Sequence, residues 1–224
     1  MTSEWDNYQK EPGHSAKWRI ENLNLKRFAG QDKTLLDIGA NQGEFGVELS
    51  KDFKHITLVE PDVEAPILSE NMTWVAKGFK DFISESNDTY DVVFSFAVTK
   101  LIWGRDDLNE HQVAKEYYNL VKPNGILVYE THLLDRVPIL GHTARILTKL
   151  RQQFGKEIES GNSRNRRMYY IFKKWYIITY INSSMNDWTK EFIKKHTAKG
   201  SHRWAFWCEG ILIGLVIGLL LWQH

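Results

Sequence analysis

The sequence predicts an α/β protein with a doubly wound, mostly parallel sheet, followed by a single C-terminal transmembrane helix. Two observations predict the sheet. Short apolar runs alternate along the chain with segments of helical character, and the run at residues 90–97 is apolar enough to be buried on both faces. A third observation predicts the final helix, because residues 205–222 form an apolar stretch that carries one charge, Glu209.

Each strand is predicted from a short apolar run, and each helix from a segment of helical character between two such runs. A helical lead-in is expected over residues 1–33. The expected strands span residues 34–38, 56–59, 73–76, 90–97, 125–131 and 168–173. The expected helices span residues 43–51, 63–71, 111–120 and 139–154. The folded domain is therefore expected over residues 34–174, and a basic connector over residues 175–203.

The composition is that of a mostly globular protein, since 42% of the 224 residues are hydrophobic and 25% are charged. The single cysteine, Cys208, excludes an internal disulfide framework and a cysteine-based zinc finger, and we expect no metal site. Residues 1–10 are polar and contain no apolar core, which argues against a cleaved secretory signal. We therefore expect an intracellular, reducing environment.

The net charge of +1 hides a division along the chain. Residues 1–141 carry 15 lysines and arginines against 23 acidic residues, whereas residues 142–203 carry 14 against 4. An acidic front and a basic back suggest that the basic segment meets an anionic partner, either a membrane surface or a nucleic acid.

The C-terminal stretch favours the membrane. Tryptophans bracket the expected transmembrane helix, residues 204–222, as aromatic side chains do at bilayer interfaces. Basic residues lie just upstream, so we expect a cytoplasmic body with its connector against membrane lipids. A buried core helix is one alternative, but three glycines and no polar face suit a soluble helix badly. A helix lying in the membrane interface is a second alternative, but no amphipathic stripe is visible. Those glycines, Gly210, Gly214 and Gly218, share one helix face; their spacing suggests a homodimer, although glycine is common in membrane helices anyway.

The strongest chemical signal is the segment LLDIGANQGEFG, residues 35–46, where the first strand meets the first helix. In open α/β sheets, ligands bind at the carboxyl ends of the strands. Gly39 permits a tight turn and a close approach of the ligand, and Asp37 can orient the loop or accept a hydrogen bond from the ligand. Glu60 closes the second strand, where a carboxylate suits the two ribose hydroxyls of an adenosine.

The same loop restricts the kind of nucleotide. Asn41 stands where a dinucleotide fingerprint needs its middle glycine, and no Gly-Lys-Ser/Thr loop is present, so the ligand looks like an adenosine without a pyrophosphate. With Asp37, Gly39 and Gly43 forming the pattern D-x-G-x-x-x-G, residues 34–131 resemble the class I S-adenosylmethionine-dependent methyltransferases. The resemblance implies a Rossmann-like sheet and S-adenosyl-L-methionine as the cofactor.

The resemblance also implies which residues bind the cofactor. Residues of the first loop would line the methionine moiety, the acidic residue after the second strand would hold the ribose, and its neighbour would flank the adenine edge. The loop after the third strand would offer an apolar face to the adenine, and the end of the fourth strand would face cofactor and acceptor. In chain order, the implied residues are Asp37, Gly39, Ala40, Asn41, Gly43, Glu60, Pro61, Phe79, Ser95 and Phe96.

Methyl transfer from a sulfonium requires mainly the placement of the acceptor and the exclusion of water. An amine or hydroxyl acceptor must also lose a proton. His132 and Glu130, at the end of the fifth strand, are candidate bases, and His132 is the predicted catalytic residue. The alternative for His132 is a solvated loop histidine.

The sequence leaves the methyl acceptor open. A membrane tail favours a lipid, a lipid-linked glycan or another small membrane-associated molecule. One alternative is a tethered RNA methyltransferase, because the basic segment 142–203 contains arginines and tyrosines that can bind phosphates and stack on bases. No DNA partner is expected, since residues 95–98 lack an Asn-Pro-Pro-Tyr motif. A second alternative is a non-catalytic adaptor that retains the fold.

Overall fold

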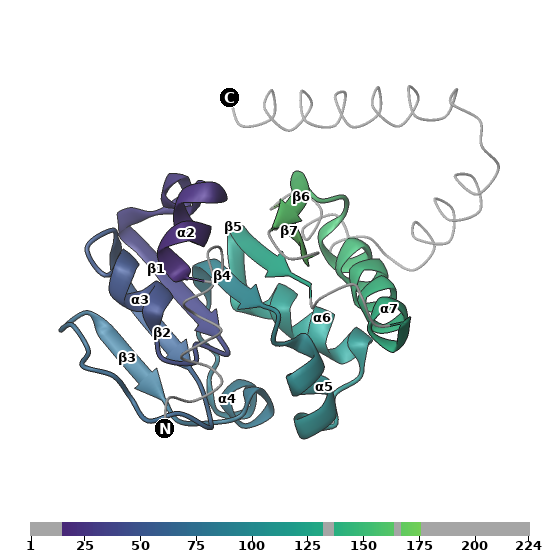
Figure 1. The fold of residues 1–224 in the computed structure, drawn as a ribbon, viewed down its shortest axis with the longest axis horizontal. Coiled ribbons are helices and arrows are strands. Elements are labelled where there is room, and N and C mark those ends of the chain that lie inside the picture. The colour runs from purple at the N-terminus through teal and green to yellow at the C-terminus, as the bar shows by residue number, and fades with distance from the viewer. Residues whose placement is uncertain (1–14, 132–136, 164–166, 176–224) are drawn as a thin grey trace, which may run out of the picture. The chain divides into compact units, whose positions relative to one another are not determined.

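The computed structural model describes residues 15–131, 137–163 and 167–175 (Figure 1). Their centre is a seven-stranded sheet with the order β3-β2-β1-β4-β5-β7-β6. Strands β1 to β5 are parallel, whereas β7 is antiparallel to both β5 and β6. The strands are β1 (Gly30–Ile38), β2 (Phe53–Val59), β3 (Met72–Val75), β4 (Tyr90–Phe96), β5 (Val121–Glu130), β6 (Glu159–Ser163) and β7 (Arg167–Lys173). The predicted doubly wound, mostly parallel sheet is confirmed.

Helices cover both faces of the sheet, and each face has its own hydrophobic core. One face packs against α2 (Ala16–Asn22), the 3₁₀ helix η1 (Leu25–Phe28) and α3 (Glu44–Leu49). The other packs against α4 (Phe79–Glu85), α5 (Thr99–Asp106), α6 (Glu110–Leu120) and α7 (Val137–Phe154) (Figure 1). Apolar side chains on both faces make the central strands near-continuous hydrophobic runs, as buried parallel strands are.

The predicted helix over residues 63–71 is wrong, because the structure has no helix between β2 and β3. Pro66 lies in the middle of that segment, and a proline inside a helix removes a hydrogen bond and clashes with the preceding turn. Its ring packs instead against the glycine loop, where a Cβ on Gly43 would lie 3.1 Å from Pro66 Cγ.

The start of the first strand and three short elements also differ from the prediction. β1 begins at Gly30 rather than residue 34, inside the expected helical lead-in, which otherwise holds α2 and η1. Helices α4 and α5 and strand β6 were not predicted. Strand β6 has the sequence ESGNS, which has no β-branched or aromatic residue, so its pairing with β7 and not its own propensity makes it a strand.

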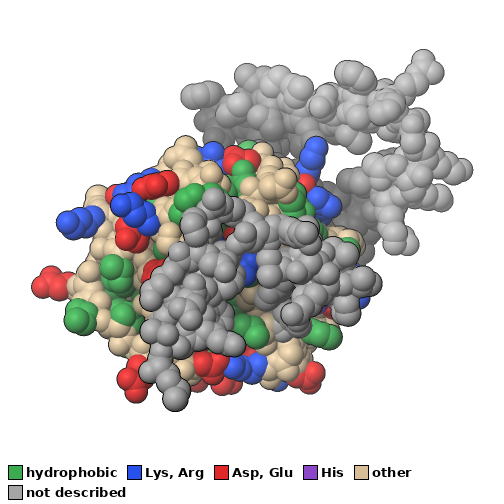
Figure 2. Space-filling view, viewed as in Figure 1, with side chains coloured by type: hydrophobic (Ala, Val, Ile, Leu, Met, Phe, Trp, Pro, Cys, Tyr) green, Lys and Arg blue, Asp and Glu red, His purple; other side chains and the backbone are tan. Residues whose placement is uncertain are grey.

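Some sequence predictions lie outside the described residues: the transmembrane helix at 204–222, its three glycines, and His132. Within the part of the chain that the structure describes, no helix combines the length and apolar character that crossing a membrane requires. The described surface visible in Figure 2 intersperses acidic and basic side chains with scattered hydrophobic ones.

Candidate active site at the carboxyl ends of the strands

Charged side chains replace hydrophobic ones at the carboxyl end of the sheet, on the face that carries α2 and α3. Alternation along each strand places Leu35 and then Asp37 on this face of β1, and register places Phe94 of β4 beside Asp37. The same alternation brings Glu130 of β5 to this face after Val128. Glu60 follows β2 in the same way, and Arg167 begins β7. Neighbouring strands therefore present a row of ionisable groups at one edge.

Asp37, near the end of β1 and just before the glycine loop, is buried, with 1% of its surface exposed. Among the described residues, its Oδ2 atom is buried and has no hydrogen-bond partner. Burial, together with the nearby charge of Glu60, raises the pKa of Asp37 to about 7, and Arg19 opposes the rise. A buried oxygen without a donor is costly, so this arrangement suits a cationic or hydrogen-bond-donating ligand.

The loop after β1 is held against Glu60. The backbone N–H of Asn41 donates to Glu60 Oε2 at 3.0 Å, and that of Asp62 donates to Oε1 at 3.0 Å. Asn41 has a positive φ of 49°. Gly39 and Gly43, two residues away on either side, also have positive φ, of 72° and 73°. Such backbone is costly for a residue with a side chain and persists where surrounding contacts fix it. Glu60 thus fixes the shape of the loop and keeps its further lone pairs for a ligand.

Gly39 is required where it stands, because its φ is +72° and Val98 packs on it. A Cβ at this position would lie 2.4 Å from Val98 Cγ2. Ala40, next in the loop, is buried, and its backbone N–H donates to the Val59 carbonyl. The first loop and the residues that follow β4 therefore touch directly.

Four of the predicted cofactor residues line one small cleft: Gly39, Glu60, Pro61 and Phe79. Phe79 itself is buried and makes an edge contact with the Tyr117 ring at 5.4 Å between centroids, so most of its side chain belongs to the core. The cleft measures about 40 Å³. Small-molecule sites are usually several hundred cubic ångströms, so an adenosine needs this cleft to widen.

Helix α5 closes the cleft from outside. Its residues Leu101, Ile102, Arg105 and Asp106 all line the cleft. Arg105 forms an ion pair with Asp62, which follows β2. Asp106 accepts a hydrogen bond from the Lys80 backbone N–H at 3.3 Å, at the start of α4. The helix thus joins the loops after β2 and β3, the two loops expected to hold the ribose and adenine.

The two predicted residues at the end of β4 face opposite layers. The Ser95 hydroxyl and the Tyr117 hydroxyl of α6 share a buried hydrogen bond of 2.8 Å, so the polar group of Ser95 is engaged in the helical layer. Phe96 faces the other side and stacks on Phe45 of α3 at 4.4 Å between ring centroids. Ala97 follows with a positive φ of 55°, which marks a sharp turn of the chain at the edge of the sheet.

Glu130 ends β5 and is 1% exposed. Its Oε1 accepts a hydrogen bond from Arg167 Nη1 at 2.9 Å and lies 3.4 Å from Arg19 Nη2. The Arg19 guanidinium carbon also lies 5.7 Å from the centre of the Phe96 ring. Glu130 Oε2 is buried without a hydrogen-bond partner in the described part of the chain. His132, the predicted base, lies outside that part.

Sequence reasoning did not identify Arg19 as part of this site. Arg19 lies in the N-terminal helix α2, and its signal was only a basic residue between Trp18 and the buried Ile20. Arg167 belongs to the basic segment 142–203 that was expected to bind phosphates, whereas the structure pairs it with Glu130. Both depend on tertiary contacts that no local pattern indicates.

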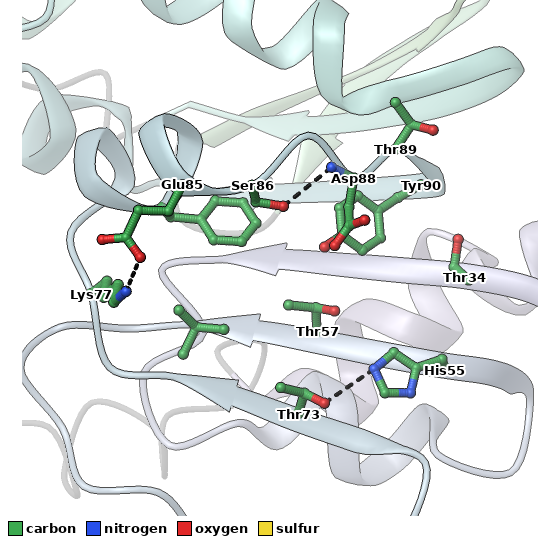
Figure 3. A pocket seen from close by; sticks show the side chains of 12 residues that line it. Thr34, His55, Thr57, Thr73, Lys77, Glu85, Ser86, Asp88, Thr89 and Tyr90 are labelled. Atoms are coloured by element: carbon green, nitrogen blue, oxygen red, sulfur yellow. Dashed lines mark hydrogen bonds and ion pairs between the residues drawn. The ribbon is translucent and has the colours of Figure 1, made fainter.

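A larger recess of about 450 Å³ lies between α4 and the strands β1 to β3 (Figure 3). Its polar side chains pair with one another: Thr73 with His55, and Lys77 with Glu85 (Figure 3). Thr34 at its far end bonds to Asp91. The recess is therefore a hydroxyl-rich hollow beside the short α4, and it extends along the strands as far as Val75 and Lys77 at the carboxyl end of β3.

Comparison with known proteins agrees with this geometry. The N-methyltransferase NodS from Bradyrhizobium japonicum WM9 is similar in structure, with a TM-score of 0.55 and 16% identity over 75% of this chain and 99% of NodS. NodS in complex with S-adenosyl-L-homocysteine has a TM-score of 0.53. Precorrin-6y C5,15-methyltransferase from Geobacter metallireducens GS-15 has a TM-score of 0.51 and 16% identity, over 70% of this chain and 88% of that one.

At such identities, these structures show a shared fold. None of the curated protein sequences matches this chain. The sequence profile of a methyltransferase domain family, however, matches residues 15–192, which is most of the chain. The match begins with the helix that carries Arg19 and includes every strand of the sheet. The chain therefore belongs to this methyltransferase domain family.

Proposed function

We propose that this chain is an S-adenosylmethionine-dependent methyltransferase that modifies a lipid, a lipid-linked glycan or another small membrane-associated acceptor. The observation that carries the choice of acceptor is the apolar C-terminal stretch at 204–222, which would hold the enzyme at a bilayer. The observation that carries the activity is the row of carboxylates at the strand ends in a methyltransferase-family domain.

The residues at these strand ends fit the cofactor. Its methionine part carries an ammonium and a carboxylate, and Asp37 Oδ2 is a buried oxygen that lacks a donor. Glu60 can accept from the ribose hydroxyls while it holds Asn41 and Asp62, because its two oxygens offer about four acceptor sites. When bound, the cofactor supplies a methyl group on a positively charged sulfur.

The chain's own residues would then hold the cofactor in place and exclude water from the site. Glu60 fixes the first loop, and Val98 packs against Gly39, so the cofactor-binding loop has one shape. Phe45 and Phe96 stack beside the charged row and keep water from its apolar side. Helix α5 covers the cleft from outside. In such an enclosed site, electrostatic contacts between charged groups are stronger than in water.

A tethered RNA methyltransferase is the second candidate, supported by the basic segment at 142–203. Several of its arginines are already paired in the described structure: Arg145 with Glu110, Arg151 with Glu157, and Arg167 with Glu130. These pairs reduce the charge available to a phosphate backbone. Anionic lipid headgroups need fewer free cations than a structured RNA track, and we favour them.

The test is methyl transfer by the full chain with methyl-tritiated cofactor. Three acceptor mixtures from the source cells are compared: vesicles of total lipid extract, total RNA, and the soluble small-molecule extract. Label in the lipid vesicles is expected. Label in RNA alone would support the second candidate and contradict the first. A chain that binds S-adenosylhomocysteine in calorimetry but labels nothing would favour a non-catalytic adaptor.

A further inference from the structure

Glu130 is a carboxylate that the cofactor does not need and that the fold leaves half satisfied. Arg167 donates to Oε1 at 2.9 Å, and Arg19 lies 3.4 Å from the same atom. The second oxygen, Oε2, is buried and has no donor among the described residues. Leaving a buried carboxylate oxygen without a donor costs free energy, so an incoming hydrogen-bond donor would be bound favourably there.

The position of Glu130 separates it from the cofactor-binding end of the row. Register pairs Glu130 with Phe96 of β4 and with Tyr169 of β7, whereas Asp37 lies on β1, on the far side of β4. The cofactor is expected across β1 and β2, so the ends of β4 and β5 remain for the acceptor. The backbone N–H of Ala97 donates to the Glu130 carbonyl at 3.0 Å, which ties the turn after β4 to this residue.

Other ionisable groups at the strand ends in the described residues are engaged. Glu60 accepts two backbone hydrogen bonds, and Asp37 would be taken by the ammonium of the cofactor. The Tyr117 hydroxyl bonds to Ser95, and burial raises the pKa of Tyr117 to about 12, which makes it a poor proton acceptor near neutral pH.

We propose that Glu130 receives the proton of the methyl acceptor, and that this acceptor reacts through an N–H or O–H group. Arg167 and Arg19 are positioning residues: they hold Oε1 and leave Oε2 for the nucleophile. In the reaction, the acceptor nitrogen or oxygen bonds to the methyl carbon as the carbon–sulfur bond breaks. The electron pair of that bond stays on sulfur, which becomes a neutral sulfide. The acceptor proton passes to Glu130 Oε2 and then to water.

This inference rests on the proposed function and names the chemical class of its acceptor. The test compares the full-length wild type with Glu130→Gln, which keeps the shape of the side chain and removes its basicity. Glu157→Gln is the matched control, because Glu157 is also paired with an arginine, Arg151, but lies on the turn between α7 and β6. Glu130→Asp tests rescue by a shorter carboxylate.

Two measurements are made on each protein: the affinity for S-adenosylhomocysteine by calorimetry, and the pH profile of tritium transfer to the mixture that the wild type labels. For Glu130→Gln, we expect affinity within about twofold of wild type and transfer reduced by about 100-fold. The acidic limb of the pH profile should disappear. Glu130→Asp should recover part of the rate, and Glu157→Gln should behave as wild type.

Three results would overturn the proposal. Transfer by Glu130→Gln at the wild-type rate would show that Glu130 receives no proton. A tenfold or larger loss of affinity for S-adenosylhomocysteine would show that Glu130 supports the cofactor site. Its effect on transfer would then come from weaker cofactor binding and not from proton transfer. A wild type that binds S-adenosylhomocysteine and labels none of the three mixtures would fail at the proposed function itself, and the role of Glu130 in it would fall too.

Discussion

At the scale of single residues, the site depends on the unusual environment of Asp37. An aspartate whose pKa is raised to about 7 binds its proton more tightly in the folded chain than in the unfolded one. Without a ligand, the contribution of Asp37 to stability therefore falls as pH rises from about 4 to about 7. Above that pH range, the full pKa shift of Asp37 lowers the free energy of unfolding by about 4 kcal/mol, relative to an aspartate with an ordinary pKa. A cation bound beside Asp37 would reverse this cost.

The pKa of Asp37 predicts how cofactor binding varies with pH. Binding of the ammonium favours the ionised carboxylate, so the affinity for S-adenosylhomocysteine should rise about tenfold between pH 6 and pH 8. Calorimetry across that range measures it. Asp37→Asn should bind weakly, with little change with pH over that range. Asp88→Asn, an exposed aspartate, should keep the wild-type rise; an affinity that is flat in the wild type would remove Asp37 from the ammonium site.

Gly39 predicts a steric effect at the same loop. Gly39→Ala would place Cβ 2.4 Å from Val98 Cγ2 at a φ of +72°, so we expect a loss of about 1–3 kcal/mol in unfolding free energy. The affinity for S-adenosylhomocysteine should fall at least about tenfold, since the loop must move. Gly104→Ala is the control, because its Cβ would meet no atom within 4 Å beyond its chain neighbours and the nearby backbone of its own helix, and it should gain about 0.5–1 kcal/mol in unfolding free energy. Chemical denaturation and calorimetry measure both variants.

At the scale of elements, the central strands were predictable because burial on both faces leaves a continuous apolar run. Strand β4, expected at 90–97, is Tyr90–Phe96. The surface elements were not predictable in this way. Residues 63–71 form a loop in which the apolar Ile67 is 97% exposed, and β6 has no β-branched or aromatic residue. Local sequence predicts the buried strands of the core, whereas the conformation of short segments at the surface depends on the neighbouring elements they contact.

Helix α5 predicts a kinetic effect of opening the cleft. Breaking the Arg105–Asp62 pair with Arg105→Gln should speed association of S-adenosylhomocysteine several-fold in stopped-flow measurements, because α5 covers a cleft of only about 40 Å³. Stability should change by less than about 1 kcal/mol, since both side chains are largely exposed. Arg151→Gln, which breaks an ion pair away from the cleft, is the control. Equal association rates in all three proteins would mean that α5 does not limit entry.

At the scale of the whole molecule, the sequence motif indicated the carboxylates of the candidate site, whereas its arginine partners became visible only in the folded structure. Asp37 and Glu60 follow from the spacing of glycines and strand ends in the sequence. Arg19 could not be predicted, because it reaches Glu130 from a helix more than a hundred residues away in the chain. Contacts of this kind come from the order of strands in the sheet, which brings β1, β4 and β5 together.

The proposed anchor predicts where the protein is found in a cell. A chain that ends at residue 203 should move from the membrane pellet to the soluble fraction and keep its affinity for S-adenosylhomocysteine within about twofold. Ultracentrifugation followed by calorimetry measures both properties. The full chain should resist extraction by high salt and yield to detergent. A shortened chain that stays in the pellet would locate membrane attachment outside residues 204–224.

Strand β7 runs antiparallel to its neighbour β5, and this reversal places Trp175 at the edge of the sheet opposite the carboxyl ends of the parallel strands. Strand β7 begins with Arg167 at the carboxyl ends of the parallel strands. At the opposite edge, just after β7, Lys174 exchanges backbone hydrogen bonds with Asn124 and Gly125. A strand of this length covers roughly 20 Å. An affinity handle or fluorescent protein fused after Trp175 would therefore be attached at the rear of the domain, with its point of attachment well clear of the mouth where substrates must enter.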